Sequence, residues 1–252
     1  HNLEQGIKLL EWTRLYSGAE PDNHHGIAFD DEGSMHRIRD DGPHLYRQKI
    51  TNPGSGSNYS NWVAVADNCQ GPCAIAADGA KIYIFYRTTA DVLWKYYSHN
   101  YGVNWSNAQL VDYAGVSYMS ASWRLTTNIV VCFALADAAS HGGFEHLAAF
   151  VLDTSTQGLT TVDHTLNNPL ISGKSSKGIG SSGTSGSIYV AFTCHVSAGP
   201  HAVFRTVLSA SNSFLAERLF LASDDDTLIT YRCPDCHLPA SPNSYESVQL
   251  AI

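Results

Sequence analysis

The stretch Ser98-His99-Asn100-Tyr101-Gly102-Val103-Asn104-Trp105 decides how the fold of this chain can be interpreted. It is a run of turn-forming Ser, Asn and Gly residues that ends in a large aromatic residue. An aromatic, strand-like run at 93–97 precedes it, and a second strand-like run at 108–111 follows it. The pattern predicts a β-hairpin in which two strands are joined by a polar turn.

Weaker copies of this pattern recur along the chain and form an internal repeat. Their closing residues lie 43, 56 and 53 residues apart, and Trp12, which precedes another strand-like run, lies 50 residues before the first of them. A spacing of about 45 to 55 residues per four-stranded unit is typical of propeller blades. The closing residues are Trp62, Trp105, Thr161 and Phe214.

Each unit also contains an apolar inner run and a middle run of β-branched and aromatic residues without helical periodicity. The inner runs are 25–29, 73–77, 117–123, 180–187 and 227–232, and clear middle runs are 82–86 and 129–135. We therefore expect one all-β domain over residues 1–252, a five-bladed β-propeller of four-stranded blades. The expected blades are approximately 24–68, 72–115, 117–170, 179–222, and 226–252 together with 6–17.

The two ends of the chain account for the last blade in this interpretation. Few residues remain after the fifth inner run, whereas the N-terminal part has a spare strand at about 7–16. Pairing that strand with the C-terminal blade would close the propeller and remove two exposed sheet edges.

Composition narrows the class of partner. Only 15% of the 252 residues are charged, the formal net charge is −8, and the 15 Lys and Arg are scattered. Without a basic stripe to contact phosphates, we expect no nucleic-acid partner. The sequence has no apolar run of about 20 residues, so we expect no membrane insertion.

The quoted stretch resembles a known motif. Ser98-x-Asn100-x-Gly102-x-Asn104-Trp105 is similar to the Asp-box, S-x-D-x-G-x-T-W, of sialidases and other BNR-repeat propellers, with Asn in place of both Asp and Thr. In that family the motif is a structural hairpin, with a short polar side chain fixing the turn and the aromatic residue packed beneath it. The stretches 12–18 and 50–57 also resemble sialidase-like propellers of phage tail and environmental virion proteins. This resemblance implies an extracellular or virion-surface location, with other virion or surface proteins as further partners.

Candidate ligand-binding residues lie where the inner runs of a propeller converge on a funnel. Aromatic side chains there provide flat faces for sugar rings, and arginines bind acidic or hydroxyl groups. The alternative is that these aromatic side chains fill the wedges between blades. The candidates are His24, His25, Tyr118, Trp123, Arg124, Tyr231 and Arg232.

An enzyme is the first alternative function. The sialidase resemblance implies three arginines that hold a substrate carboxylate, and Arg37, Arg124 and Arg232 could supply them, but no Tyr and Glu pair completes the site. Five-bladed glycosidases would instead need two or three carboxylates in one funnel. The available acids are Asp22, Asp30, Asp31, Glu145 and Asp153, and most of them are typical of solvated turns. We assign no catalytic residue.

The string Cys233-Pro234-Asp235-Cys236-His237 satisfies the C-x-x-C-H pattern for covalent attachment of c-type haem. A disulfide, a pair of free thiols, and zinc bound with a distant His are the other interpretations of these cysteines. Cys69 and Cys73 form a second close pair, which could likewise be a disulfide or two thiols, whereas Cys132 and Cys194 are typical of core thiols.

Together these patterns favour a non-catalytic recognition or structural propeller that binds a glycan or cell-surface saccharide. We expect no cofactor and no metal centre. A glycoside hydrolase of sialidase-like type and a c-type haem electron-transfer protein remain the alternatives.

Overall fold

The computed structural model describes residues 25–53, 58–125, 127–166, 175–195 and 201–223. Within these ranges every regular element is a β-strand and no helix occurs, so none of the described chain forms a membrane-spanning helix. The strands form four antiparallel sheets, which we number blades 1 to 4 in chain order. The predicted all-β architecture is confirmed for this part of the chain.

The strands have the following bounds. Blade 1 contains β1 (His25–Phe29), β2 (Met35–Asp41), β3 (His44–Thr51), β4 (Asn58–Tyr59) and β5 (Val63–Ala66). Blade 2 contains β6 (Cys69–Asp78), β7 (Lys81–Thr88), β8 (Val92–Ser98) and β9 (Ser106–Asp112). Blade 3 contains β10 (Val116–Arg124), β11 (Ile129–Ala136), β12 (His146–Asp153) and β13 (Leu159–Thr165). Blade 4 contains β14 (Ser175–Gly183), β15 (Ile188–His195), β16 (His201–Leu208) and β17 (Arg218–Ser223).

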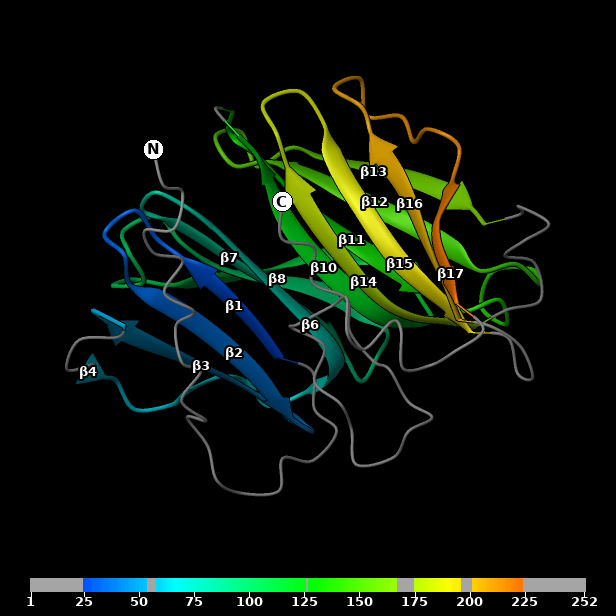
Figure 1. Cartoon of the computed structure of the whole chain (residues 1–252). Helices are drawn as coiled ribbons and strands as arrows, with labels where there is room; N and C mark the ends of the chain where they lie inside the picture. The colour runs from blue at the N-terminus through cyan, green and yellow to red at the C-terminus, as the bar shows by residue number, and fades with distance from the viewer. Residues whose placement is uncertain (1–24, 54–57, 126, 167–174, 196–200, 224–252) are drawn as a thin grey trace, which may run out of the picture.

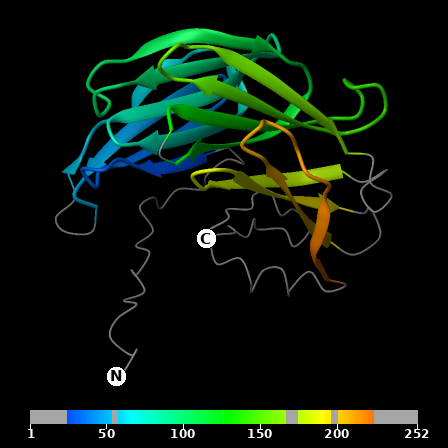
Figure 2. The same cartoon turned by 90° about the horizontal axis from the view of Figure 1, so that it is seen from above.

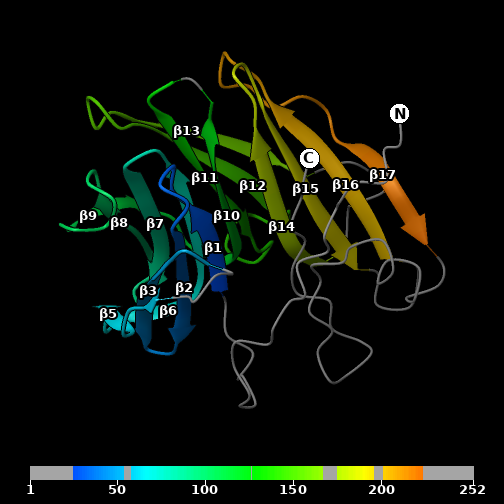
Figure 3. The same cartoon turned by 60° about the vertical axis from the view of Figure 1, so that its left-hand side comes forward.

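The strands of blades 2, 3 and 4 pair in the order in which they follow along the chain, so these blades are antiparallel meanders, and blade 1 begins in the same way with β1, β2 and β3. The first strands of successive blades contact one another, β1 with β6, β6 with β10, and β10 with β14. Figure 1 shows these strands toward the middle of the molecule with β17 at its periphery, and Figure 3 shows β9 and β17 at opposite sides. Figure 2 shows from above how the sheets follow one another around that middle.

The hydrophobic core lies between the faces of neighbouring blades, because both faces of a central blade are covered. One cluster joins blades 1 and 2, a second joins blades 2 and 3, and a third joins blades 3 and 4. Tyr83 and Phe85 of β7, Phe133 of β11 and Phe192 of β15 are fully buried in them. The continuous apolar runs of the middle strands therefore result from burial on both faces.

The quoted hairpin and its copies occupy one structural position. In blades 2, 3 and 4 each connects the third strand of the blade to its outer strand, at 99–105, 154–158 and 209–217, and the copy in blade 1 lies partly outside the described residues. In blade 1 the predicted outer strand is split, since both β4 and β5 pair with β3. Residues 6–17 and 226–252 lie outside the described ranges, so a fifth blade and its closure stay predictions.

Candidate functional site

The turn between β8 and β9 is held by its own side chains. The hydroxyl of Ser98 donates to Oδ1 of Asn100 (2.9 Å), and the backbone NH of Gly102 donates to the Ser98 hydroxyl (2.9 Å). Oδ1 of Asn100 also accepts from the backbone NH of Asn104 (2.9 Å). Trp105 donates from Nε1 to the Gly102 carbonyl (2.7 Å). The short polar side chains thus satisfy turn amides that would otherwise lack partners.

A shallow recess of about 250 Å³ opens beside this turn. Its wall combines two aromatic rings with amide and hydroxyl groups, and the rings of Tyr97 and His99 lie 5.4 Å apart. Tyr97 is in turn stacked on Tyr83 at 5.3 Å, which holds its ring in place. The lining residues are Tyr97, Ser98, His99, Asn100, Asn104 and Ser106.

A hydrogen-bond network behind the recess orients His99. Nε2 of Gln157 donates to the hydroxyl of Tyr83 (3.3 Å), and this hydroxyl is hydrogen-bonded to Nε2 of His99 (2.7 Å). Burial, with the charges of Lys81 and Lys95, lowers the pKa of His99, so its imidazole is neutral.

The network belongs to a contact that recurs between blades. In each case a Lys or Arg side chain of one blade donates to the turn between the third and fourth strands of the next blade. Each of these turns contains a residue with positive φ. We call this contact the inter-blade clasp. Its members are Lys49 Nζ to the Tyr101 carbonyl (3.1 Å), Lys95 Nζ to Gln157 Oε1 (2.7 Å), and Arg124 Nη2 to the Ser209 carbonyl (3.1 Å) and Asn212 Oδ1 (2.9 Å).

The structure separates the three candidate residues of β10. Tyr118 and Arg124 lie on the face toward blade 4, where Tyr118 packs on the apolar cluster and Arg124 forms its clasp. Trp123 lies on the opposite face and packs edge-on against Tyr83 of blade 2 at 5.8 Å. Side chains on a strand alternate between its faces, and in a blade those faces contact the two neighbouring blades. Trp123 and Arg124 are both buried between blades.

The remaining sequence candidates lie at or beyond the edge of the described chain. His25 begins β1, and only its backbone is described. The others, His24, Tyr231, Arg232, Cys233, Cys236 and His237, lie outside the described residues. Ligand-binding and haem-binding roles for them stay predictions.

The acids considered for catalysis have structural partners where they are described. Asp30 begins the β1–β2 turn, where its carboxylate accepts from the backbone NH of Ser34 (2.8 Å) and from Nε2 of His36 (2.9 Å). Asp153 accepts from the backbone NH and the hydroxyl of Ser155 in the β12–β13 turn. Both residues therefore occupy turns, as predicted.

The three cysteines whose side chains are described are buried and outside any disulfide, and only the backbone of Cys194, in β15, is described. Cys69 and Cys73 lie in β6 and Cys132 lies in β11, and none of them forms a disulfide. Burial raises the pKa of Cys69 to about 12. The core role predicted for Cys132 is confirmed, while the disulfide considered for Cys69 and Cys73 does not form.

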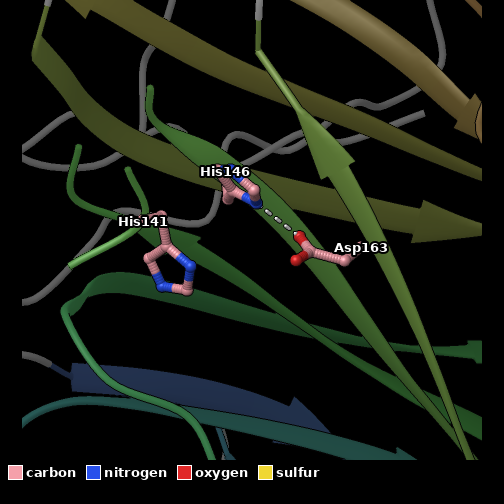
Figure 4. Close-up of side chains that lie close together, drawn as sticks. All are labelled: His141, His146 and Asp163. Atoms are coloured by element: carbon pink, nitrogen blue, oxygen red, sulfur yellow. Dashed lines mark hydrogen bonds and ion pairs between the residues drawn. The ribbon is translucent and has the colours of Figure 1, made fainter. Parts of the chain in front are cut away.

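A second group of polar side chains was missed by the sequence reasoning. His141, His146 and Asp163 come from the β11–β12 loop, β12 and β13, and one ligand atom from each lies within 4.8 Å of the others (Figure 4). Only the spacing of His141 and His146 hinted at it, because Asp163 joins them through strand pairing.

Comparisons with known proteins support the fold. No protein-family model and no curated protein sequence matches the chain. The solved SapL1 lectin in complex with alpha methyl fucoside is similar, with TM-score 0.54 and 10% identity over 81% of this chain and 67% of that chain. A NanB sialidase mutant from Streptococcus pneumoniae has TM-score 0.47 and 13% identity over 67% of this chain and 27% of that chain. The WD40 domain of SCAP from fission yeast has TM-score 0.42 and 12% identity over 83% of this chain and 55% of that chain. The lectin likeness and the four meander sheets support a β-propeller fold for the described chain.

Proposed function

We propose that this chain is a non-catalytic recognition propeller that binds a glycan in the recess beside the β8–β9 turn. The observation that carries the proposal is the lining of that recess, two aromatic rings beside hydroxyl and amide groups. Sugars present both apolar C–H faces and ring hydroxyls, so a site for them combines aromatic surface with fixed polar groups.

The size of the recess favours a small ligand. Its volume of about 250 Å³ is below the range of about 300 to 1,000 Å³ that is common for drug-sized molecules. A single sugar unit, or the end of a longer glycan, suits it. The likeness in fold to a lectin that binds alpha methyl fucoside adds support for a saccharide ligand.

The partners of the described acids favour binding over hydrolysis. Asp30 and Asp153 hold turns, whereas a glycosidase needs two carboxylates that face the scissile bond. We also propose the extracellular or virion-surface setting implied by the phage-tail resemblance, since a saccharide-binding module acts where saccharides are displayed.

Binding is tested by titration calorimetry with a panel of monosaccharides that includes alpha methyl fucoside. Asn104 is exposed at the mouth of the recess, and Asn104→Ala should weaken binding of the best sugar by about 5- to 10-fold, the loss of one hydrogen bond. The matched control is Asn107→Ala, an exposed residue of β9 outside the lining. Equal binding by wild type and Asn104→Ala would exclude the recess, and sugar release from aryl glycosides would favour the hydrolase alternative.

We further infer a fifth blade, formed by the chain ends, that covers the free face of blade 1. That face carries Phe29, which is 56% exposed, and the guanidinium groups of Arg37 and Arg39, which both stack on Trp62. Residues 1–24 and 224–252 contain nine acidic and three basic residues, so their charge is complementary to the two arginines. Their combined length matches one blade of the repeat.

Phe29→Ser tests the fifth blade through the free energy of unfolding. A covered Phe29 should cost about 2 kcal/mol or more when it is truncated, because apolar surface is lost from an interface. Val103→Ser, at a residue that is 75% exposed in a turn, is the control and should change stability little. Equal, small effects at both positions would contradict the fifth blade.

A further inference from the structure

We propose that His141, His146 and Asp163 form a zinc site at the outer part of blade 3. Two imidazole nitrogens and a carboxylate oxygen lie within 4.8 Å of one another. Figure 4 shows the three side chains close together, with the contact between His146 and Asp163 marked, and the rings of His141 and His146 are stacked at 4.7 Å. Glycan recognition involves neither the residues nor the location of this site, so the proposal is independent of it.

The loop that carries His141 is held by its contacts with residues 113–115. Nε2 of His141 lies 3.0 Å from the carbonyl oxygen of Ala114, which can only accept, so Nε2 carries the proton and Nδ1 has a free lone pair. A backbone bond from Asp137 to the Gly115 carbonyl (2.9 Å) joins the same segments. Gly115 has φ +71°, and a Cβ there would lie 2.5 Å from the hydroxyl oxygen of Ser140. The loop that carries His141 is therefore closely packed against residues 113–115.

The other two ligands are brought together by strand pairing. His146 pairs with Thr165 and Ala148 pairs with Asp163, so His146 and Asp163 are diagonal neighbours on one face of the sheet. Nδ1 of His146 lies 2.8 Å from Oδ1 of Asp163. The Tyr113 hydroxyl also donates to Oδ1 of Asp163 (3.1 Å), which orients the carboxylate from the blade 2 side. Such outer contacts to ligating residues are common at metal sites.

This set of ligands fits zinc. Imidazole and carboxylate are both zinc ligands, at about 2.0 to 2.2 Å, and two ligands of a tetrahedral ion lie about 3.3 Å apart. Nδ1 of His146 and Oδ1 of Asp163 are closer than this, at 2.8 Å, while the three ligand atoms as a set lie within 4.8 Å of one another. Zinc binding therefore needs the first pair to separate slightly and His141 to move closer. Three protein ligands leave one tetrahedral position for water or an outside ligand. The side chain of Asp163 is 42% exposed, so an ion can reach this ligand from solvent.

The site is at the opposite end of the blades from the recess. His146 is the first residue of β12, the third strand of blade 3, whereas Ser98 is the last residue of β8, the third strand of blade 2. Equivalent strands of successive propeller blades run in the same direction, so these two residues lie at opposite ends. Zinc binding and sugar binding should therefore be separable by substitution. They would fail separately if either proposal were wrong.

The test is equilibrium dialysis of the full chain against Zn²⁺, followed by X-ray absorption of the bound ion. We expect one zinc ion held by nitrogen and oxygen ligands near 2.0 to 2.1 Å. His146→Gln and the isosteric Asp163→Asn should each weaken zinc binding by at least about 10-fold. Circular dichroism of both variants checks that they are folded.

Two controls make the outcome decisive. His44 and Asp67 form a matched His–carboxylate pair at 3.2 Å outside the proposed ligand set, so His44→Gln should leave zinc affinity unchanged. A Cys233→Ser, Cys236→Ser double variant removes the other sequence candidate for zinc and should also bind normally. Sulfur ligands in the absorption spectrum, or unchanged affinity in folded His146→Gln and Asp163→Asn, would overturn the proposal.

Discussion

The ammonium group of Lys95 in blade 2 donates to Oε1 of Gln157 in blade 3 at 2.7 Å, although the two residues lie 62 positions apart in the chain. Gln157 has φ +62° in the β12–β13 turn, and its Nε2 also donates to the Thr154 carbonyl and to the Tyr83 hydroxyl. The ammonium of Lys95 thus holds the Gln157 side chain. That side chain closes the β12–β13 turn and also bonds Tyr83, on which the recess residue Tyr97 is stacked. The same contact therefore stabilises the packing of blades 2 and 3 and supports the side chains that line the recess.

Lys95→Met should reduce the free energy of unfolding by about 1 to 3 kcal/mol. Methionine retains most of the apolar stem but leaves Oε1 of Gln157 without its donor in a partly buried contact. Urea unfolding followed by tryptophan fluorescence measures the change. Lys81→Met is the control, because the Lys81 bond to Asn128 is exposed and should contribute less than about 1 kcal/mol. Equal losses for the two variants would contradict a special role for the clasp.

Gly183→Ala should destabilise the chain by about 3 kcal/mol or prevent folding. A Cβ at Gly183 would overlap the carbonyl oxygen of Trp123, so the backbones of blades 3 and 4 would have to separate. Gly186→Ala is the matched control, since a Cβ there has no neighbour within 4 Å. Thermal unfolding of both variants separates the steric effect from the general effect of replacing a glycine. A mild effect at Gly183 would show that these blades are not in close contact.

Stability should fall as the pH falls below about 6.5, because of the Asp30–His36 pair. Burial lowers the pKa of His36 from 6.5 and outweighs the opposing bond to Asp30. Burial raises the pKa of Asp30, but the bonds from His36 and Ser34 outweigh it and leave the pKa below 3.8. Both groups therefore bind protons more readily in the unfolded state, first at the histidine and then, below about pH 3.8, at the carboxyl.

Urea unfolding of wild type and His36→Gln between pH 7 and pH 3 measures this dependence. The variant keeps an amide donor for Asp30 but cannot titrate, so the stability difference between the two proteins should change mainly between pH 7 and 5. A difference that is constant over this interval would contradict the neutral, buried state of His36. The loss of stability near and below pH 3.8 should persist in His36→Gln, since Asp30 is retained.

Asn100→Ala should destabilise the chain by about 1 kcal/mol, whereas Asn100→Asp should be close to neutral. Oδ1 of Asn100 accepts from the Ser98 hydroxyl and from the backbone NH of Asn104, and a carboxylate oxygen can accept both bonds. Chemical unfolding of the two variants beside Asn107→Ala measures the contribution of this one oxygen. If aspartate were as damaging as alanine, the functional likeness of this turn to the Asp-box would be lost.

The local structure was largely predictable from the sequence. The run Ser98 to Trp105 predicted a polar turn between strands, and the structure confirms it with bonds between residues that are at most four positions apart. The runs 82–86 and 129–135 predicted strands because β-branched and aromatic side chains suit a pleated, buried surface. Such interactions depend on near neighbours in the chain, which sequence patterns report directly.

The candidate sites depended on contacts that no local pattern encodes. Tyr118, Trp123 and Arg124 were grouped by sequence proximity, yet strand alternation sends Trp123 toward blade 2 and Arg124 toward blade 4. Conversely, Asp163 meets His146 only through the pairing of β12 with β13, and Lys95 meets Gln157 only because their blades pack together. The sequence by itself therefore determined the strands and their turns, through side-chain size, branching and turn chemistry. Only the tertiary structure decided which faces meet, because that depends on strand register and blade packing.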